Sequence, residues 1–148
     1  MENLWVVYCD GSAVPNPGRM GIGAVLTEPN GERHTLSQAM STKGCNNEAE
    51  LRALMTALQD LKSRGADTLL VHSDSRVLVE QLGKAEVKPI KRLASLFDEA
   101  RVLLKSFDQA SVMWIPRHRN SEADALARAA LGISPKCTVK TPKNRRKS

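Results

Sequence analysis

The chain has 148 residues, of which 41% are hydrophobic and 26% charged. This length and apolar content fit one globular domain with a single core, so we expect no second folded domain. The longest apolar run, 4–9, is far shorter than the roughly 18 residues that cross a bilayer, and the start of the chain lacks the basic residues of a secretory signal. We therefore expect a soluble cytoplasmic protein that does not bind membranes.

The positive charge is concentrated in the last part of the chain. Residues 136–148 hold six Lys or Arg and no acid, which equals the net charge of +6, so residues 1–135 sum to zero. We expect residues 134–148 to form a disordered basic tail, because they offer too little apolar surface to offset the entropy lost on ordering. Such a tail either contacts nucleic acid or only keeps the protein soluble. The folded domain is then expected over residues 1–133.

Apolar periodicity predicts three strands and a helix in the first half of the chain. A β-branched and aromatic run predicts a buried strand over 4–9, and a second strand-like run covers 22–26 after a Pro-Gly turn signal. An Asn-Gly turn then predicts an antiparallel strand over 33–40. Leucine and methionine next recur at helical spacing, which predicts a helix of about four turns capped by Asn46 or Asn47.

The second half of the chain alternates strands with helices. Its predicted strands are 68–73 and 111–115. Its predicted helices are 74–83, 93–107 and 120–131, the last of which starts with an asparagine or a serine as its cap. The order βββαβααβα predicts an α/β fold in which helices flank a five-stranded mixed sheet. The first, fourth and fifth strands of this sheet are expected to be parallel.

Two of the predicted strands end on an acid. Asp10 follows the first strand and Asp74 the fourth, and in such sheets sites gather at the carboxyl ends of the parallel strands. Glu50 lies on the helix stripe expected to face the sheet, and Asp124 lies in the first turn of the last helix, partly inward. Each aspartate alone is explained by capping of backbone amides, which fits Glu50 less well. Four acids at one rim repel one another unless cations neutralise them, so the pattern predicts an oxygen-ligand site for Mg²⁺ or Mn²⁺.

The motifs around these acids resemble, in order, the signature of type 1 ribonuclease H. The resemblance covers residues 3–131 and is carried by Asp10-Gly-Ser12, Asn16-Pro-Gly18 with Gly21 and Gly23, Asn46-Asn-Glu-Ala-Glu50-Leu, Ser73-Asp74-Ser75, and Asn120 through Ala127. It implies a ribonuclease H fold and an endonuclease that hydrolyses the RNA strand of RNA/DNA hybrids. It also implies that the catalytic and metal-binding carboxylates are Asp10, Glu50, Asp74 and Asp124.

The implied cofactor is a pair of Mg²⁺ ions, with Mn²⁺ as an alternative. Hydrolysis of a phosphodiester needs an activated water and stabilisation of the departing 3′ oxygen, and two metal ions supply both. Our hypothesis is that Asp10 and Asp124 hold the ion that activates water. The ion nearer the leaving group would be held by Asp10, Glu50 and Asp74. The products would then carry 5′-phosphate and 3′-hydroxyl ends.

The resemblance also implies residues that assist catalysis or contact the substrate. His118 lies in the basic loop 116–119, where the family often carries a histidine that moves protons or helps product release. A surface that only contacts phosphates is the alternative. Five residues near the acids are expected to touch the hybrid: Gly11, Ser12, Asn16, Asn46 and Asn47. The connector 84–92 is basic but lacks the aromatic residues with which many members grip DNA, so we expect the tail to assist binding.

Two other functions are compatible with the sequence. One is a different magnesium nuclease on the same fold, acting on DNA junctions or transposon ends, and the other is a binding module that has lost its activity. The density of matched motifs favours the hybrid-cleaving enzyme, and the presence of all four carboxylates argues against the inactive module. We expect the chain to act as a monomer.

Overall fold

The computed structural model describes residues 3–83 and 90–133. Five strands form one sheet in the order β3-β2-β1-β4-β5. The strands β1 (Leu4–Val14), β2 (Gly18–Thr27) and β3 (Arg33–Gly44) form an antiparallel meander, and β4 (Thr68–Ser73) and β5 (Gln109–Trp114) run parallel to β1. The predicted mixed sheet is therefore confirmed, together with its three parallel strands.

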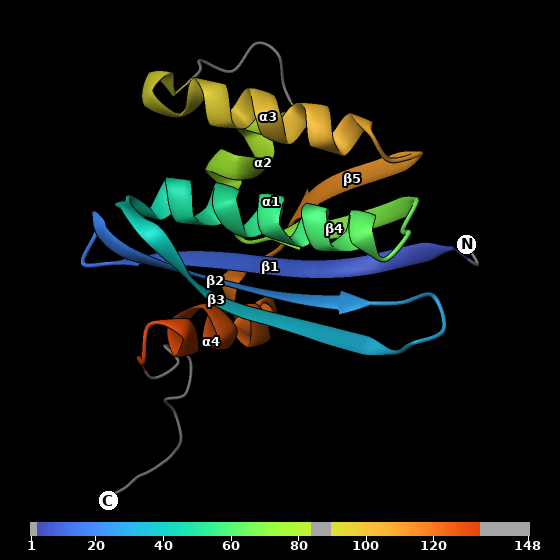
Figure 1. Ribbon diagram of the computed structural model, residues 1–148, viewed down its shortest axis with the longest axis horizontal. Coiled ribbons are helices and arrows are strands. Elements are labelled where there is room, and N and C mark those ends of the chain that lie inside the picture. Colours follow the sequence, from blue (N-terminus) through green and yellow to red (C-terminus); the bar gives the residue numbers. More distant parts are fainter. Residues whose placement is uncertain (1–2, 84–89, 134–148) are drawn as a thin grey trace, which may run out of the picture.

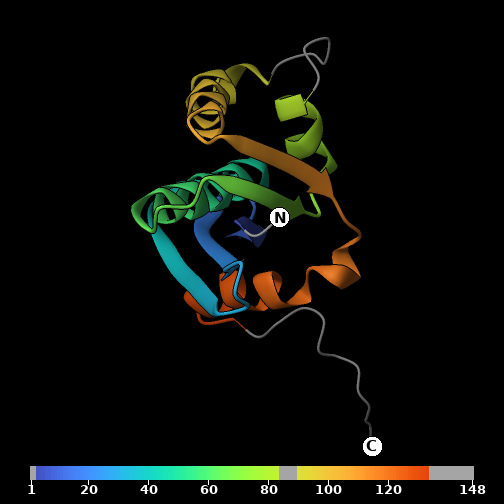
Figure 2. The ribbon, with the colours of Figure 1, turned by 90° about the vertical axis from the view of Figure 1, so that its right-hand side faces the viewer.

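Helices cover both faces of the sheet (Figure 1). On one face α1 (Asn46–Ser63) packs across β1 and β2, and α2 (Arg76–Gly83) and α3 (Ala94–Lys105) pack against β5, with α3 also resting on α1. On the other face α4 (Ser121–Ala130) packs against the three strands of the meander, as Figure 2 shows from the side. Short 3-10 turns, η1 (Lys91–Leu93) and η2 (Arg117–Arg119), lead into α3 and α4.

The largest part of the core lies between the sheet and α1. Leu51, Leu54, Leu58 and Leu61 recur at helical spacing, and all four are fully buried. Burial of one such side chain contributes about 1.5–3 kcal/mol, so these leucines decide which side of α1 faces the sheet. The same stripe carries Glu50 one turn before Leu54. Packing of apolar residues therefore carries an acid to the sheet.

Glycine allows two helices to lie directly on strands. A Cβ on Gly11 of β1 would lie 2.1 Å from the carbonyl oxygen of Ala49 in α1, and one on Gly23 of β2 would lie 2.4 Å from the carbonyl oxygen of Ala123 in α4. Any larger residue at either position would push the helix away from the sheet. Both carbonyls belong to the residue directly before a predicted metal ligand. The two glycines thus set how closely two of the acids approach the sheet.

The strand β1 is longer than predicted. The prediction ended at Cys9, because Asp, Gly and Ser are poor strand formers, yet the strand continues to Val14 and contains Asp10. Its antiparallel pairing with β2 extends as far as Val14, whereas its parallel pairing with β4 ends at Tyr8. Pairing with β2 therefore overrides the local preference. Asp10 lies inside β1, just beyond the point where β4 ends.

The start of α1 also differs from the prediction. Its N-cap is Cys45 and not Asn46 or Asn47, because the Glu48 amide donates to Cys45 Sγ at 3.4 Å. The side chain of Asn46 has another partner: its Oδ1 accepts a hydrogen bond from the Ala13 amide at 2.8 Å. The asparagine that local preference would assign to the cap instead ties α1 to β1.

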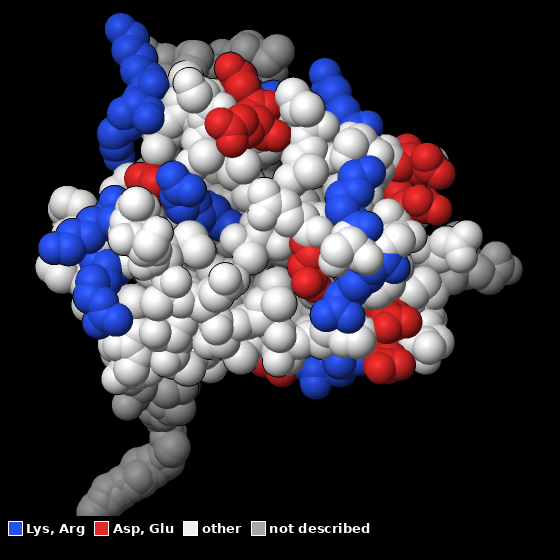
Figure 3. Space-filling view, in the orientation of Figure 1, with Lys and Arg blue, Asp and Glu red and all other residues white. Residues whose placement is uncertain are grey.

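Two predicted basic segments fall wholly or partly outside the described residues: the tail 134–148 and positions 84–89 of the connector. What was predicted for them stays a prediction. On the face in Figure 3, acidic side chains lie over α3 and basic ones to either side. This mixed surface agrees with the neutral balance of residues 1–135. Within the described parts of the chain, no helix combines the length and apolar character needed to cross a membrane.

Candidate active site

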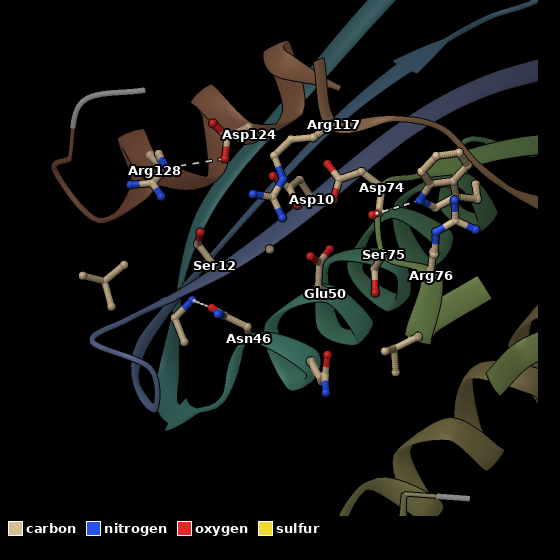
Figure 4. A pocket seen from close by; sticks show the side chains of 16 residues that line it. Asp10, Ser12, Asn46, Glu50, Asp74, Ser75, Arg76, Arg117, Asp124 and Arg128 are labelled. Carbon is tan, nitrogen blue, oxygen red and sulfur yellow. Dashed lines mark hydrogen bonds and ion pairs between the residues drawn. The ribbon is translucent and has the colours of Figure 1, made fainter. Parts of the chain in front are cut away.

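Three segments far apart in the sequence each bring a carboxylate to one place. Asp10 comes from β1, Glu50 from α1 and Asp74 from the residue after β4, and one oxygen of each lies within 4.8 Å of the others. Figure 4 shows these side chains pointing into a common space. Asp124, from the first turn of α4, lines the same cavity of about 690 Å³. The four acids predicted to converge thus lie together.

One wall of this cavity is formed by residues predicted to touch the substrate. Gly11 and Ser12 of β1 line it together with Asn46 and Asn47 at the start of α1. Asn16 is not among the lining residues; its Oδ1 accepts a hydrogen bond from the Asn46 amide at 2.9 Å. Asn16 therefore supports the wall indirectly, through its hydrogen bond to Asn46.

Burial and mutual repulsion raise the pKa of two of the acids. Asp10 is 5% exposed, and burial first, then the charge of Asp74, raise its pKa from 3.8 to about 8. The pKa of Glu50 lies well above its usual range, because the group is buried and because Asp10 and Asp74 repel its charge. A bound cation would reverse this effect and favour the ionised forms. The electrostatics of the site therefore favour a cation among the acids.

Two buried carboxylate oxygens at the site have no hydrogen-bond partner among the described residues. They are Glu50 Oε1 and Asp124 Oδ2. Buried polar atoms in proteins are nearly always paired, so these oxygens call for a ligand. A donor set of carboxylate oxygens suits a hard divalent cation such as Mg²⁺ or Mn²⁺ rather than zinc. The residues present therefore fit the predicted ions.

Capping of a helix does not explain Asp74. The N-terminus of α2 is capped by Ser75, whose Oγ accepts a hydrogen bond from the Leu78 amide at 3.1 Å, and α2 begins two residues after Asp74, not at it as predicted. The Asp74 carboxylate accepts a hydrogen bond from Asn120 Nδ2 at 3.0 Å instead. It is turned toward the other acids.

Two arginines bring positive charge to the acids: Arg128, which was not predicted, and Arg117 of the basic loop 116–119, for which a phosphate-contacting surface was the alternative prediction. Arg128 Nε lies 3.5 Å from Asp124 Oδ1, and Arg117 reaches from η2 over the carboxylates (Figure 4). The spacing of four residues to Asp124 was a sequence signal for Arg128. His118 is exposed on the same turn and does not line the cavity, so its auxiliary catalytic role stays a prediction. The basic loop places Arg117 at the acids.

An aromatic residue and a third arginine form the edge of the cavity on the β5 side. The guanidinium of Arg76 lies over the ring of Trp114, 3.9 Å from its centre, and Trp114 Nε1 donates to the Asp74 carbonyl oxygen at 3.2 Å. Trp114 is 36% exposed. Stacked cationic and aromatic groups of this kind are surfaces on which nucleic acids pack. No local pattern indicates this pair, since 38 positions separate the two residues.

Comparison with known proteins agrees with this fold and site. A family model described as reverse transcriptase-like matches residues 8–130, which defines the broad class of the chain. Ribonuclease HI of Halobacterium salinarum is 36% identical over 126 residues, which cover 84% of this chain and 62% of that protein. The chain belongs to the ribonuclease H family and is similar to its type 1 members, as the motifs predicted.

Solved structures and a longer relative support the same assignment. The crystal structure of the Halobacterium salinarum enzyme matches 87% of this chain and 98% of its own, with a TM-score of 0.81 at 33% identity. The structure of LC11-RNase H1 in complex with an RNA/DNA hybrid matches with a TM-score of 0.76 at 32% identity and covers 86% of this chain and 96% of that one. A bifunctional protein of Mycobacterium tuberculosis is 36% identical over 128 residues, and the match spans 85% of this chain and 35% of that protein.

Proposed function

We propose that this protein hydrolyses the RNA strand of RNA/DNA hybrids with two divalent metal ions and leaves 5′-phosphate and 3′-hydroxyl ends. The observation that carries the proposal is the meeting of three carboxylates from β1, α1 and the end of β4 within 4.8 Å of one another. The relative whose structure was solved with an RNA/DNA hybrid supports the choice of substrate. Family members named ribonuclease H support the choice of reaction.

The four carboxylates divide into two overlapping sets. Asp10, Glu50 and Asp74 would hold one ion, and Asp10 with Asp124 would hold the other. Bound there, two Mg²⁺ or Mn²⁺ ions supply an activated water and stabilise charge on the departing 3′ oxygen. Asp10 is common to both sets because it lies inside the strand against which α1 and α4 pack on opposite faces. It must give up the proton that its raised pKa retains at neutral pH.

The wall beside the acids would recognise the RNA strand. Recognition of RNA over DNA requires contacts to the 2′-hydroxyl groups, which both donate and accept hydrogen bonds. Two hydrogen bonds hold Asn46 in place for this role. Its side-chain Oδ1 accepts from the Ala13 backbone amide, and its backbone amide donates to Asn16 Oδ1. The neighbouring Asn47, with Gly11 and Ser12 of β1, supplies further polar groups on the same wall.

The arginines at the cavity would meet the phosphates of the substrate. A cleavable strand brings a negative charge with every nucleotide into a site that already holds four acids. Arg117 lies over the carboxylates and Arg128 beside Asp124, so both stand where a phosphate next to the reacting bond would approach. Arg76, on the Trp114 ring, would contact the strand further along the cavity. These cations reduce the repulsion that the acids alone would exert on the substrate.

A cleavage assay on three duplexes tests this proposal. Labelled RNA/DNA hybrid, double-stranded RNA and double-stranded DNA are incubated with the protein in Mg²⁺, in Mn²⁺ and with a chelator. We expect cleavage of the RNA strand of the hybrid only, and only with metal, and products that accept a 5′ label only after phosphatase treatment. Cleavage of double-stranded DNA, or hydrolysis of the hybrid that persists with the chelator, would refute the proposal.

A further inference from the structure

Asn120 occupies the N-cap position of α4 but does not cap the helix with its side chain. An asparagine there usually accepts a hydrogen bond from an amide of the first turn, which stabilises a helix by about 1 kcal/mol. Here the side chain is 2% exposed and turned away from α4. Its Nδ2 donates to the Cys9 carbonyl oxygen at 3.0 Å and to Asp74 Oδ2 at 3.0 Å. The side chain of Asn120 therefore makes two hydrogen bonds to distant segments in place of the helix cap.

The orientation of this amide follows from its neighbours. A carbonyl oxygen and a carboxylate oxygen both accept hydrogen bonds, so only the NH₂ group of Asn120 can face them. The two partners lie 111 and 46 residues away in the sequence. The backbone of Asn120 makes a third link, because its carbonyl oxygen accepts from the Asp124 amide at 3.1 Å.

These three bonds connect the segments that carry three of the four acids. Cys9 directly precedes Asp10, and Asp74 and Asp124 are themselves acids of the site. The sheet pairing of β1 with β4 ends at Tyr8, one residue before Cys9. The amide of Asn120 therefore continues the connection between β1 and the chain after β4, where sheet hydrogen bonds are no longer made.

The same contact keeps Asp74 within the cluster despite the repulsion among the acids. An oxygen of Asp74 lies within 4.8 Å of an oxygen of Asp10, so the two groups repel each other when both are ionised. The hydrogen bond that Asn120 Nδ2 donates to Asp74 Oδ2 fixes the orientation of this carboxylate. The carboxylate nevertheless keeps an oxygen within 4.8 Å of oxygens of Asp10 and Glu50. The hydrogen bond orients Asp74 toward the shared space and does not withdraw it.

We infer that Asn120 is a positioning residue that holds Asp10, Asp74 and Asp124 in the arrangement that the metal ions require. It touches neither ion nor substrate and acts through the carboxylate of Asp74 and through the backbone at Cys9 and Asp124. The inference rests on the metal-dependent activity proposed above. Residues that orient metal ligands in this way typically account for about 10–100-fold in metal affinity or activity.

The test compares two variants of Asn120 with a control at the same helix terminus. Asn120→Ala removes both donors, and Asn120→Asp keeps the size of the side chain but puts an acceptor against Asp74 Oδ2. Ser121→Ala is the control, because Ser121 is exposed at the first position of α4 and lies next to Asn120. Mn²⁺ binding is measured by electron paramagnetic resonance of the free ion, and turnover of the hybrid is measured over a range of Mg²⁺ concentrations.

For Asn120→Ala we expect Mn²⁺ affinity and kcat each to fall about 10–100-fold, with KM for the hybrid within about threefold of wild type. The Mg²⁺ concentration for half-maximal activity should rise, which a residue that only stabilises the fold would not cause. Asn120→Asp should lose turnover at least as strongly, although it fills the same volume. Ser121→Ala should behave as wild type.

Each opposing outcome has a distinct meaning. A folded Asn120→Ala or Asn120→Asp protein with wild-type kcat and metal dependence would overturn the inference. So would the loss of folded structure in both variants by circular dichroism, because Asn120 would then be a residue of the fold and not of the site. If the wild-type protein binds no Mn²⁺ and cleaves no hybrid, the proposed function fails, and this inference fails with it.

Discussion

Replacement of Asp10 by Asn tests the electrostatics of the site through protein stability. Without metal, burial and the charge of Asp74 raise the pKa of Asp10 from 3.8 to about 8. Between these two values the folded chain binds more protons than the unfolded chain, so the free energy of unfolding falls as pH rises. The part of the free energy of unfolding that depends on protonation of Asp10 is fully present below pH 3.8 and is lost as pH approaches about 8.

The size of the effect follows from the same shift. One pH unit corresponds to about 1.4 kcal/mol, so the distance from the ordinary pKa of Asp to pH 7 corresponds to about 4 kcal/mol. Asparagine has nearly the same shape and no charge. Metal-free Asp10→Asn should therefore be more stable than wild type by up to about 4 kcal/mol at pH 7, and by about 2 kcal/mol at pH 5. Cleavage should fall by at least about 10³-fold, because a ligand common to both ions is lost.

Urea unfolding at pH 5 and pH 7, with chelator or with Mg²⁺, measures this difference alongside the cleavage assay. Mg²⁺ should stabilise wild type strongly and Asp10→Asn weakly, because only an ion that binds the folded state raises its stability. Asp108→Asn is the matched control, since Asp108 is exposed and should change stability by less than about 0.5 kcal/mol. The reasoning would be refuted by an Asp10→Asn protein no more stable than wild type at pH 7, or by one that cleaves normally with Mg²⁺.

Four further results are expected. Gly11→Ala should cost about 1–3 kcal/mol in thermal melts and reduce cleavage, because its methyl group would meet the backbone of α1, whereas Gly83→Ala, with open space around it, should be neutral. The role predicted for His118 requires that His118→Ala lower turnover by roughly 10²-fold, and near-normal turnover would leave it a surface residue. Deletion of residues 136–148 should weaken hybrid binding and reduce the slope of log K against log salt by up to about 5; an unchanged slope would contradict a role for the tail. Mg²⁺ affinity should rise with pH up to about 8, with proton release from Asp10 detectable by calorimetry in two buffers, and no release would contradict the raised pKa.

Local periodicity was enough to predict the fold and the four acids. The leucine spacing of α1 decides which side is buried, and that side carries Glu50 wherever the helix packs. Likewise, the parallel pairing of β1 with β4 brings Asp10 and Asp74 together just beyond the last paired residues, Tyr8 and His72, although β1 itself continues to Val14. These inferences need only the type and spacing of residues. They hold because burial of apolar surface dominates the placement of each element.

The other residues of the site depend on contacts that the sequence does not encode locally. Asn120 has the residue type of a helix cap, and only the distant Cys9 carbonyl and Asp74 carboxylate turn it to another role. Arg117 and His118 are adjacent in η2, yet Arg117 lines the cavity and His118 does not. The direction of each side chain follows from the backbone of this turn. Where local preference and tertiary contact compete, the tertiary contact prevails at this site.

The site has two parts that differ in local stability: the part carried by α4 and the part carried by β1, α1 and the end of β4. Asp124 and Asn120 belong to a ten-residue helix and its cap, the last helix of the described chain, on the face of the sheet opposite α1. Short helices with few buried residues open more readily than the strands beneath them. Each such opening would remove one carboxylate and the amide that orients another, and leave β1, α1 and β4 intact. Hydrogen exchange of the α4 amides should then show this opening well below the temperature at which the sheet itself melts.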